Sequence, residues 1–337
     1  MSLSEFMDSM LPAIETELKN CVQIVQQDGL IELHHMLSYH LGWEGADAGN
    51  KAQGKRVRPL LLLLTTSAAS GIWENALPAA AAVELVHNFS LIHDDIQDNS
   101  NLRRGRRTVW EKWGIAQALN AGDSMFALAH IALRRLEELV PTDIALKAQH
   151  ILPKACLTLT QGQYLDLSYE DRKDLSVEDY WPMIKGKTAA LLAACTELGA
   201  LLAGVKEDIV KSYRRFGEFI GLAFQVQDDI LGIWGDTTLT GKSVESDLLA
   251  GKKSLPVLFA LEHGKDFAKK WENGNINSKD VPELVVLLEN EGAYDYAKKK
   301  ANKLTKQALG YLEEANPIGS SAIALKELVN KLVHRSQ

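Results

Sequence analysis

Apolar residues recur every three or four positions along most of the chain, which is the spacing of helices with a buried face. Alternation with period two between tight turns, the signal of strands, is missing. The pattern therefore predicts an all-α protein. The expected helices cover Leu3–Gln27, Leu30–Leu41, Val57–Ser70, Asn75–Ser100, Trp110–Leu139, Ile144–Glu170, Val177–Ala203, Ile209–Trp234, Leu255–Leu261 and Ala293–Ala315.

Gly, Pro and charged residues interrupt the helical pattern in several stretches, none with the composition of a flexible linker. We therefore expect one domain over residues 1–337. A hydrophobic content of 46% is enough for a large core. The predicted breaks are 42–54, 102–108, 170–176, 235–254 and 273–281.

Composition excludes some classes of partner. The net charge of −7 gives no general basic field, so no nucleic acid is expected and anionic ligands must meet local clusters of Lys and Arg. The cysteines Cys21, Cys156 and Cys195 are odd in number and widely spaced, which indicates a reducing, cytoplasmic setting without disulfides or zinc. Residues 188–205 just reach the length of a membrane span, but their Ala and Gly content favours a core helix, so no transmembrane segment is expected.

Two segments resemble each other: LIHDDIQD at 91–98 and QVQDDILG at 225–232. Each places adjacent carboxylates near the end of an apolar helix and before a basic, Gly-containing loop. A helix turns by about 100° per residue, so His87, Ser90, Asp94 and Asp98 share one stripe. Carboxylates at i and i+4 repel each other, and Mg²⁺ would relieve the repulsion. The alternative is a solvated surface face.

The second helix carries Gly217, Gly221, Gln225 and Asp228 on one stripe. Glycine inside a helix costs up to about 1 kcal/mol relative to Ala, so something requires the space above these positions. The stripe indicates either the wall of a cavity or close helix packing.

Basic clusters accompany the acidic pairs. GKRVRP at 54–59 puts cations at a helix start, where free N–H groups also favour anions. LRRGRR at 102–107 follows Asp98, and Lys242, Lys252 and Lys253 follow the second acidic pair. Acidic pairs followed by basic loops suit two diphosphates bridged by metal, because Arg and Mg²⁺ both bind phosphate oxygens.

The motifs GKRVRP, LIHDDIQD with RRG, GQYLDL, the Lys187-Thr188 pair, FQVQDDI and TGKS…SDL…GKKSLP occur in this order between Gly54 and Pro256. In this order the chain resembles the trans-type isoprenyl diphosphate synthases, or polyprenyl synthetases. The resemblance implies the isoprenoid synthase fold, a bundle of about ten or more long helices around a deep central cavity. It also implies a homodimer and a Mg²⁺-dependent prenyltransferase that joins an allylic diphosphate to isopentenyl diphosphate.

The resemblance implies a role for each matching residue. Asp94, Asp98 and Asp228 would hold Mg²⁺ on the allylic diphosphate, with Arg103, Lys242 and Lys252 as further contacts. The isopentenyl diphosphate would meet Lys55, Arg58, His87 and Arg104. Beside the allylic C1 would lie Lys187, Thr188 and Gln225, and the pocket floor would lie at Phe89 and Ser90.

An aromatic Phe89 and a small Ser90 resemble enzymes that stop at the twenty-carbon geranylgeranyl product, with a fifteen-carbon farnesyl product as the alternative. The chain departs from the family at Gly232, where an Asp is usual, which weakens the expected third metal site; Asp236 or Asp247 could supply an outer partner. A non-catalytic subunit of a heteromeric synthase would fit Gly232. A terpene cyclase would not need the isopentenyl site.

Overall fold

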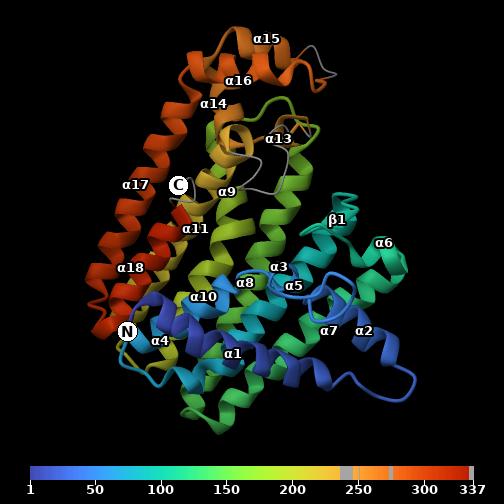
Figure 1. The fold of residues 1–337 in the computed structure, drawn as a ribbon. Coiled ribbons are helices and arrows are strands. Elements are labelled where there is room, and N and C mark those ends of the chain that lie inside the picture. Colours follow the sequence, from blue (N-terminus) through green and yellow to red (C-terminus); the bar gives the residue numbers. More distant parts are fainter. Residues whose placement is uncertain (236–245, 250, 273–275, 334–337) are drawn as a thin grey trace. The chain divides into compact units, whose positions relative to one another are not determined.

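The computed structural model describes residues 1–235, 246–249, 251–272 and 276–333. Regular structure in these ranges is almost entirely helical, which confirms the all-α class (Figure 1). The chain forms two compact units, each assembled from three stretches of sequence. This division into units does not test whether residues 1–337 form a single domain, which stays a prediction.

The first unit comprises Met1–Pro153, Ala194–Lys211 and Asn316–Leu325. Its central helix is α5, which packs against α1, α4 and α7. Ala79 to Ala82 are fully buried on α5, and their small side chains allow neighbouring helices to approach closely. The elements wholly within this unit are α1 (Leu3–Gln23), α2 (Ile31–His40), α3 (Asn50–Gln53), α4 (Val57–Ala68), η1 (Trp73–Ala76), α5 (Leu77–Gln97), β1 (Leu102–Arg103), β2 (Arg106–Arg107), α6 (Val109–Trp113), α7 (Ile115–Arg134) and η2 (Arg135–Glu138).

The second unit comprises Lys154–Ala193, Ser212–Ala315 and Lys326–Gln337. Helix α14 contacts α9, α15, α16 and α17, and its apolar side chains join a buried cluster that includes Phe267, Leu284 and Leu288. The elements wholly within this unit are α9 (Val177–Ile184), η3 (Lys185–Ala189), α13 (Ser246–Leu249), α14 (Leu255–His263), α15 (Asp266–Glu272), α16 (Val281–Asn290) and α17 (Ala293–Glu314).

The chain passes from one unit to the other within four helices, and once more in the segment between α17 and α18. The four helices are α8 (Thr142–Tyr169), α10 (Ala190–Leu202), α11 (Glu207–Trp234) and α18 (Gly319–Val333). Helix α10 falls within the apolar stretch 188–205. In the part of the chain that the structure describes, no helix combines the length and apolar character needed to span a bilayer.

The predicted helices are found, with three local differences. The helix expected over 110–139 is broken at Gly114, whose φ of +81° is a left-handed conformation that ends α6. The helix expected over 177–203 contains a π-helical turn, η3. The loop expected at 102–108 folds into an antiparallel hairpin with Leu102 opposite Arg107, too short for any periodic signal. The short helices α3 and α13, which lie in predicted breaks, and the longer helices α15, α16 and α18 were not predicted.

The cysteines lie apart in the core. Cys21, Cys156 and Cys195 are free and at most 5% exposed. Burial raises the pKa of the Cys21 and Cys195 thiols to about 12 and that of Cys156 to about 11. All three thiols therefore stay protonated at neutral pH.

Candidate active site

The first acidic motif lies at the C-terminal end of α5. Asp94 is in the last turn of this helix and Asp98 is its C-cap, while the last turn contains no basic residue. The C-terminal end of a helix carries partial negative charge, and a carboxylate there is disfavoured by about 0.3–1 kcal/mol. A hard cation such as Mg²⁺ would remove this repulsion, and carboxylate oxygens are the ligands it prefers. Asp94 and Asp98 therefore fit a metal whose remaining ligands are phosphate and water.

The intervening Asp95 has a different role. It is 2% exposed and accepts hydrogen bonds from Arg103 Nε at 2.8 and 2.9 Å, and Arg103 Nη2 lies 2.8 Å from its Oδ1. Burial raises the pKa of the Asp95 carboxyl, while Arg103 opposes the shift. The ion pair ties the hairpin to α5. Arg103, predicted to bind the allylic diphosphate, is thus held on a carboxylate.

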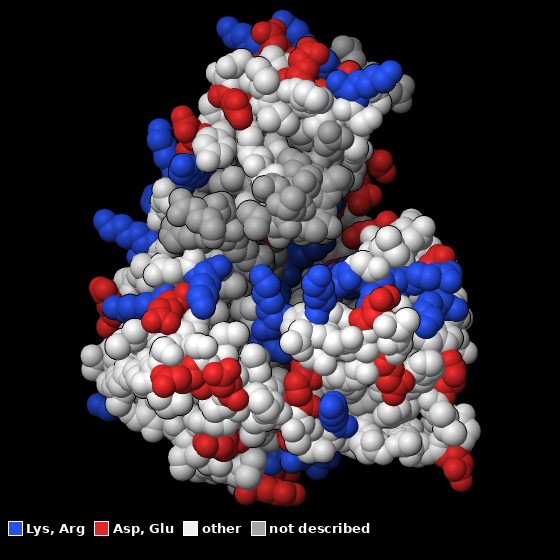
Figure 2. Space-filling view, viewed as in Figure 1, with Lys and Arg blue, Asp and Glu red and all other residues white. Residues whose placement is uncertain are grey.

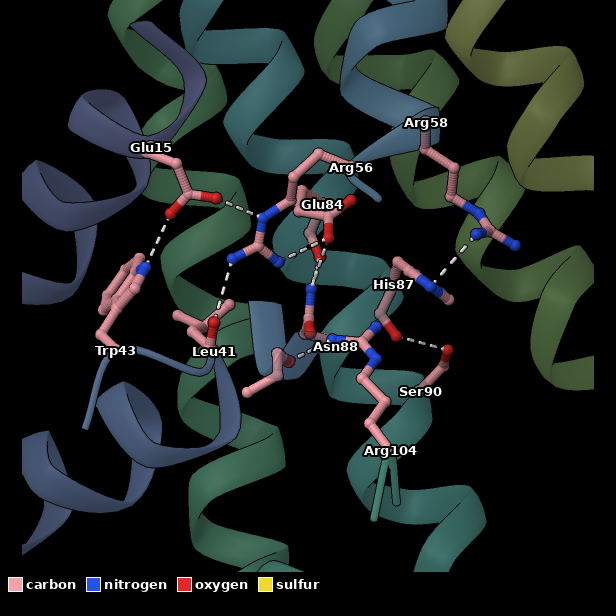
Figure 3. Close-up of polar contacts among 11 residues, drawn as sticks. Glu15, Leu41, Trp43, Arg56, Arg58, Glu84, His87, Asn88, Ser90 and Arg104 are labelled. Atoms are coloured by element: carbon pink, nitrogen blue, oxygen red, sulfur yellow. Dashed lines mark hydrogen bonds and ion pairs between the residues drawn. The ribbon is translucent and has the colours of Figure 1, made fainter. Parts of the chain in front are cut away.

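Three of the residues predicted for isopentenyl diphosphate, Arg58, His87 and Arg104, lie near one another in the first unit (Figure 3). Arg58 Nη1 lies 3.1 Å from His87 Nε2. Burial, and to a smaller extent Arg58, holds the pKa of His87 well below its ordinary value, so the ring is neutral and accepts from Arg58. Arg104 donates to the Ala52 carbonyl at 2.7 Å, and Lys55 is exposed. Two cationic forks and a neutral imidazole are suited to an anion.

Arg56 of the same motif is buried beneath this cluster. Its backbone is left-handed, with φ of 46°, and its guanidinium is directed inward. The group donates to Glu15 at 2.6 Å, to Glu84 at 2.9 Å and to the Leu41 carbonyl at 3.1 Å (Figure 3). Asn88 donates to Glu84 as well, at 3.0 Å. Arg56 therefore anchors the start of α4, between Lys55 and Arg58.

Phe89 and Ser90 lie on α5 between His87 and the acidic motif. The Phe89 ring is half-buried, with its centroid 5.3 Å from that of Phe126 on α7 and 5.1 Å from that of His93. Ser90 is buried and donates to the His87 carbonyl at 2.8 Å. The aromatic contact holds Phe89 against α7.

The Lys187-Thr188 pair lies in the π-helical turn η3 of the second unit. Such turns are rare and are frequently found at functional sites. Lys187 forms an ion pair with Asp166, the acidic residue of GQYLDL. Gly186 makes the turn possible by packing against Gly162, where an added Cβ would lie 2.7 Å from the Gly162 Cα.

Thr188 and Gln225, which are both predicted to lie beside the allylic C1, contact each other. Thr188 Oγ1 donates to Gln225 Oε1 at 2.6 Å, and Gln225 Nε2 donates to Asp229 at 2.9 Å. Asp229 also accepts from Tyr180 Oη at 2.7 Å and from the Leu255 N–H at 2.9 Å. Burial raises the pKa of Asp229 to about 7 against these hydrogen bonds. Asp229 is thus fully engaged inside the protein, which leaves Asp228 as the metal-ligand candidate.

The surroundings of Gly221 show whether this glycine lines a cavity or allows close helix packing, the two alternatives that the sequence left open. A Cβ on it would lie 2.5 Å from the Cα of Ala189, so the residue serves close packing of α11 against η3. The cavity-wall interpretation is wrong at Gly221. Packing here also explains how Gln225, one turn later, reaches Thr188.

The basic residues of the second loop are only partly described. Lys242 and Asp236 lie outside the described residues, as does the side chain of Asp247, and Lys252 is exposed. The face in Figure 2 mixes basic with acidic side chains, so the net charge of −7 is not gathered into one field there.

Several residues of the site were not singled out by sequence reasoning. Glu84 and Asn88 had no signal beyond their place on a strongly apolar helix. Asp166 and Asp229 lay inside motifs that were noted, but nothing in a motif tells which of its carboxylates is buried. Tyr180 could not be found, because its partner is 49 residues away in the chain.

Known proteins resemble this chain over most of its length. The family model described as "Polyprenyl synthetase" matches residues 45–287. A (2E,6E)-farnesyl diphosphate synthase of Mycobacterium tuberculosis is 39% identical over 310 residues, covering 89% of this chain and 85% of the relative. A geranylgeranyl diphosphate synthase of the same organism is 38% identical over 301 residues, covering 87% and 85%.

Solved structures are similar to this chain as well. The polyprenyl synthetase of Streptomyces coelicolor has a TM-score of 0.89 at 33% identity and covers 98% of this chain and 100% of its own. The geranylgeranyl pyrophosphate synthetase of Pyrococcus horikoshii has a TM-score of 0.88 at 31% identity, covering 98% and 97%. The protein thus belongs to the polyprenyl synthetase family and is a prenyltransferase, an isoprenyl diphosphate synthase of a class that generally depends on Mg²⁺.

Proposed function

We propose that this enzyme adds isopentenyl diphosphate to dimethylallyl, geranyl or farnesyl diphosphate and makes geranylgeranyl diphosphate, releasing diphosphate. The observation that supports this product length is the position of Phe89, an aromatic residue five positions before Asp94. Its ring packs against Phe126. Such a pair can limit the depth available to a growing chain. Relatives with farnesyl and geranylgeranyl products have similar identities of 39% and 38%, so farnesyl diphosphate is the alternative product.

Isopentenyl diphosphate binds to Lys55, Arg58, His87 and Arg104 in this proposal. Support comes from the Arg58–His87 contact of 3.1 Å, in which the neutral His87 ring accepts a hydrogen bond and orients the Arg58 guanidinium. An Arg fork matches two phosphate oxygens at once. The inward position of Arg56 supports its exclusion from this set.

The allylic diphosphate binds through Mg²⁺ held by Asp94, Asp98 and Asp228, with Arg103, Lys242 and Lys252 as further contacts. When bound, Mg²⁺ neutralises the charge that develops on the departing diphosphate. Arg103 is still partly exposed beside its partner Asp95, so it can present further N–H groups to an anion. These contacts strengthen as the bond breaks and therefore lower the barrier.

The allylic carbon becomes a carbocation that the isopentenyl double bond attacks, and a proton is then lost to the released diphosphate. The oxygens of Lys187 and Thr188, together with Gln225, lie near this carbon and stabilise its positive charge. Support comes from the π-helical turn that carries the first two residues and from the 2.6 Å hydrogen bond between Thr188 and Gln225. Water must be excluded, because it would capture the cation as an alcohol.

The enzyme acts as a homodimer in the cytoplasm. Support for a dimer comes from Ile115, Leu119 and Ile131 on α7, large apolar side chains that are 53%, 42% and 46% exposed. Three free, buried thiols agree with a reducing compartment.

Incubating the protein with Mg²⁺, isopentenyl diphosphate and each allylic starter, followed by mass spectrometry, tests the reaction and the product. We expect a ladder that ends at twenty carbons and that Phe89→Ala extends, whereas the control Phe219→Ala on α11 leaves product length unchanged. A ladder ending at fifteen carbons would contradict geranylgeranyl diphosphate as the product. An inactive protein revived by Gly232→Asp would identify a damaged metal site, and one not revived would favour a non-catalytic subunit.

A further inference from the structure

A continuous chain of hydrogen bonds crosses the second unit from α9 and α14 to the π-helical turn. Tyr180 Oη and the Leu255 N–H donate to Asp229 Oδ2 at 2.7 and 2.9 Å. Gln225 Nε2 donates to Asp229 Oδ1 at 2.9 Å, and Thr188 Oγ1 donates to Gln225 Oε1 at 2.6 Å. Asp229 and Thr188 are each 7% exposed, so water does not replace these partners readily.

In its ionised form, Asp229 determines the direction of every bond in this chain. A backbone N–H can only donate, and three donors surround the carboxylate, so both of its oxygens act as acceptors. The Gln225 amide must then turn its NH₂ group toward Asp229, because a flipped amide would set carbonyl against carboxylate oxygen. Its carbonyl is left for Thr188, which can satisfy it only by giving up its hydroxyl proton.

We infer that Asp229 is a positioning residue that fixes the hydrogen-bond direction, or polarity, of Thr188. It makes the Thr188 hydroxyl a donor to Gln225 and leaves the oxygen lone pairs directed away from Gln225. This inference rests on the proposed function, in which Thr188 lies beside the allylic carbon. An oxygen whose proton is already committed offers lone pairs to an electron-poor carbon. It cannot also donate that proton to the diphosphate and hold the substrate in its unreacted state.

Close packing keeps the chain of hydrogen bonds short. Gly221 lies one turn before Gln225 on α11 and contacts Ala189, the residue after Thr188. Since any side chain at Gly221 would push α11 away from the π-helical turn, the 2.6 Å contact depends on this glycine. The polarity of Thr188 is thus set by buried groups that do not touch substrate.

Replacing the carboxylate by an amide should reverse the relay. In Asp229→Asn, Tyr180 and Leu255 can still donate to the new carbonyl, so the new NH₂ group faces Gln225. The Gln225 amide then flips and donates to Thr188, whose proton becomes free. At pH 8 we expect kcat to fall by about 10²-fold, the usual loss for one preorganised group, with an unchanged KM for isopentenyl diphosphate.

A charge-preserving exchange provides the decisive variant. In Asp229→Asn with Gln225→Glu, the new carboxylate accepts from both Asn and Thr188, so Thr188 donates again. We expect Gln225→Glu alone to be slow, because it opposes two carboxylates, and the double variant to recover kcat to within about tenfold of wild type. Tyr213→Phe, which removes a buried hydroxyl of α11 that has no hydrogen-bond partner among the described residues, is the control and should leave kcat unchanged.

The outcomes separate the relay from the proposed function. A fully active Asp229→Asn beside a slow Thr188→Val would overturn the relay alone, as would a folded double variant no faster than Gln225→Glu. A fully active Thr188→Val would overturn both. Should Asp229→Asn fail to fold, the comparison of Gln225→Glu with the double variant still decides.

Discussion

Neighbouring residues of one motif have opposite roles in this protein. In GKRVRP, Lys55 is exposed and Arg58 contacts His87, whereas Arg56 is buried against Glu15 and Glu84. The sequence predicts the cations but not this division, because the left-handed backbone that turns Arg56 inward depends on partners far along the chain. The same holds for the DD pair at 94–95, because the motif does not show that the buried Asp95 pairs with Arg103.

Removing one partner of the buried Arg56–Glu84 pair should be costly. Arg56→Met leaves two carboxylates without their cation, and we expect the free energy of unfolding in urea to fall by about 3–5 kcal/mol. Adding Glu84→Met should recover part of this loss, because two apolar side chains need no charge compensation.

The control is Arg107→Met, whose exposed pair with Glu111 has a similar distance of 2.8 Å. An exposed ion pair contributes at most about 1 kcal/mol, so this variant should unfold nearly like wild type. Equal losses for Arg56→Met and Arg107→Met would refute the anchoring role of Arg56.

At the scale of elements, helices were predictable and their irregularities were not. Apolar periodicity located most long helices, because it records which face is buried. It could not show the π-helical turn at Lys185–Ala189, since one extra residue per turn barely changes the pattern. Its cause is tertiary: Gly162 of α8 and Gly186 of the turn interlock without side chains between them.

Gly162→Ala should disrupt this crossing. A Cβ there would lie 2.0 Å from the Lys187 N and 2.5 Å from the Gly186 C, both backbone atoms that cannot rotate away. We expect a stability loss of about 1–3 kcal/mol from overpacking, and a fall in kcat because Lys187 and Thr188 shift.

Gly310→Ala is the matched control, since the space around Gly310 in α17 is open. Alanine there should stabilise the helix by up to about 1 kcal/mol. Differential scanning calorimetry of both variants compares them directly, and a Gly162→Ala enzyme as stable as Gly310→Ala would disprove the crossing.

For the whole molecule, the sequence indicated the fold class, the reaction class and the helices that carry the site. It could not indicate which apolar residues stay exposed, because exposure depends on what covers each helix. Ile115, Leu119 and Ile131 of α7 are periodic apolar positions like those of the core, yet they remain half-exposed in the single chain.

Sedimentation velocity tests whether a second copy covers them. We expect the wild type to sediment as a dimer and Leu119→Glu with Ile131→Glu to sediment as a folded monomer, because burying two carboxylates in an apolar interface is unfavourable. Ile323→Glu on α18, at a site 60% exposed, should leave the dimer intact. A wild type that is monomeric at micromolar concentration would contradict the proposal.

The three buried thiols have a practical consequence for spectroscopy. Because Cys21, Cys156 and Cys195 are shielded and protonated, alkylating reagents should attack a newly introduced surface cysteine far faster than any of them. A fluorophore or spin label can thus be attached to the introduced cysteine without first replacing the three native cysteines. One probe on each unit would then report how the distance between the units responds when diphosphates bind.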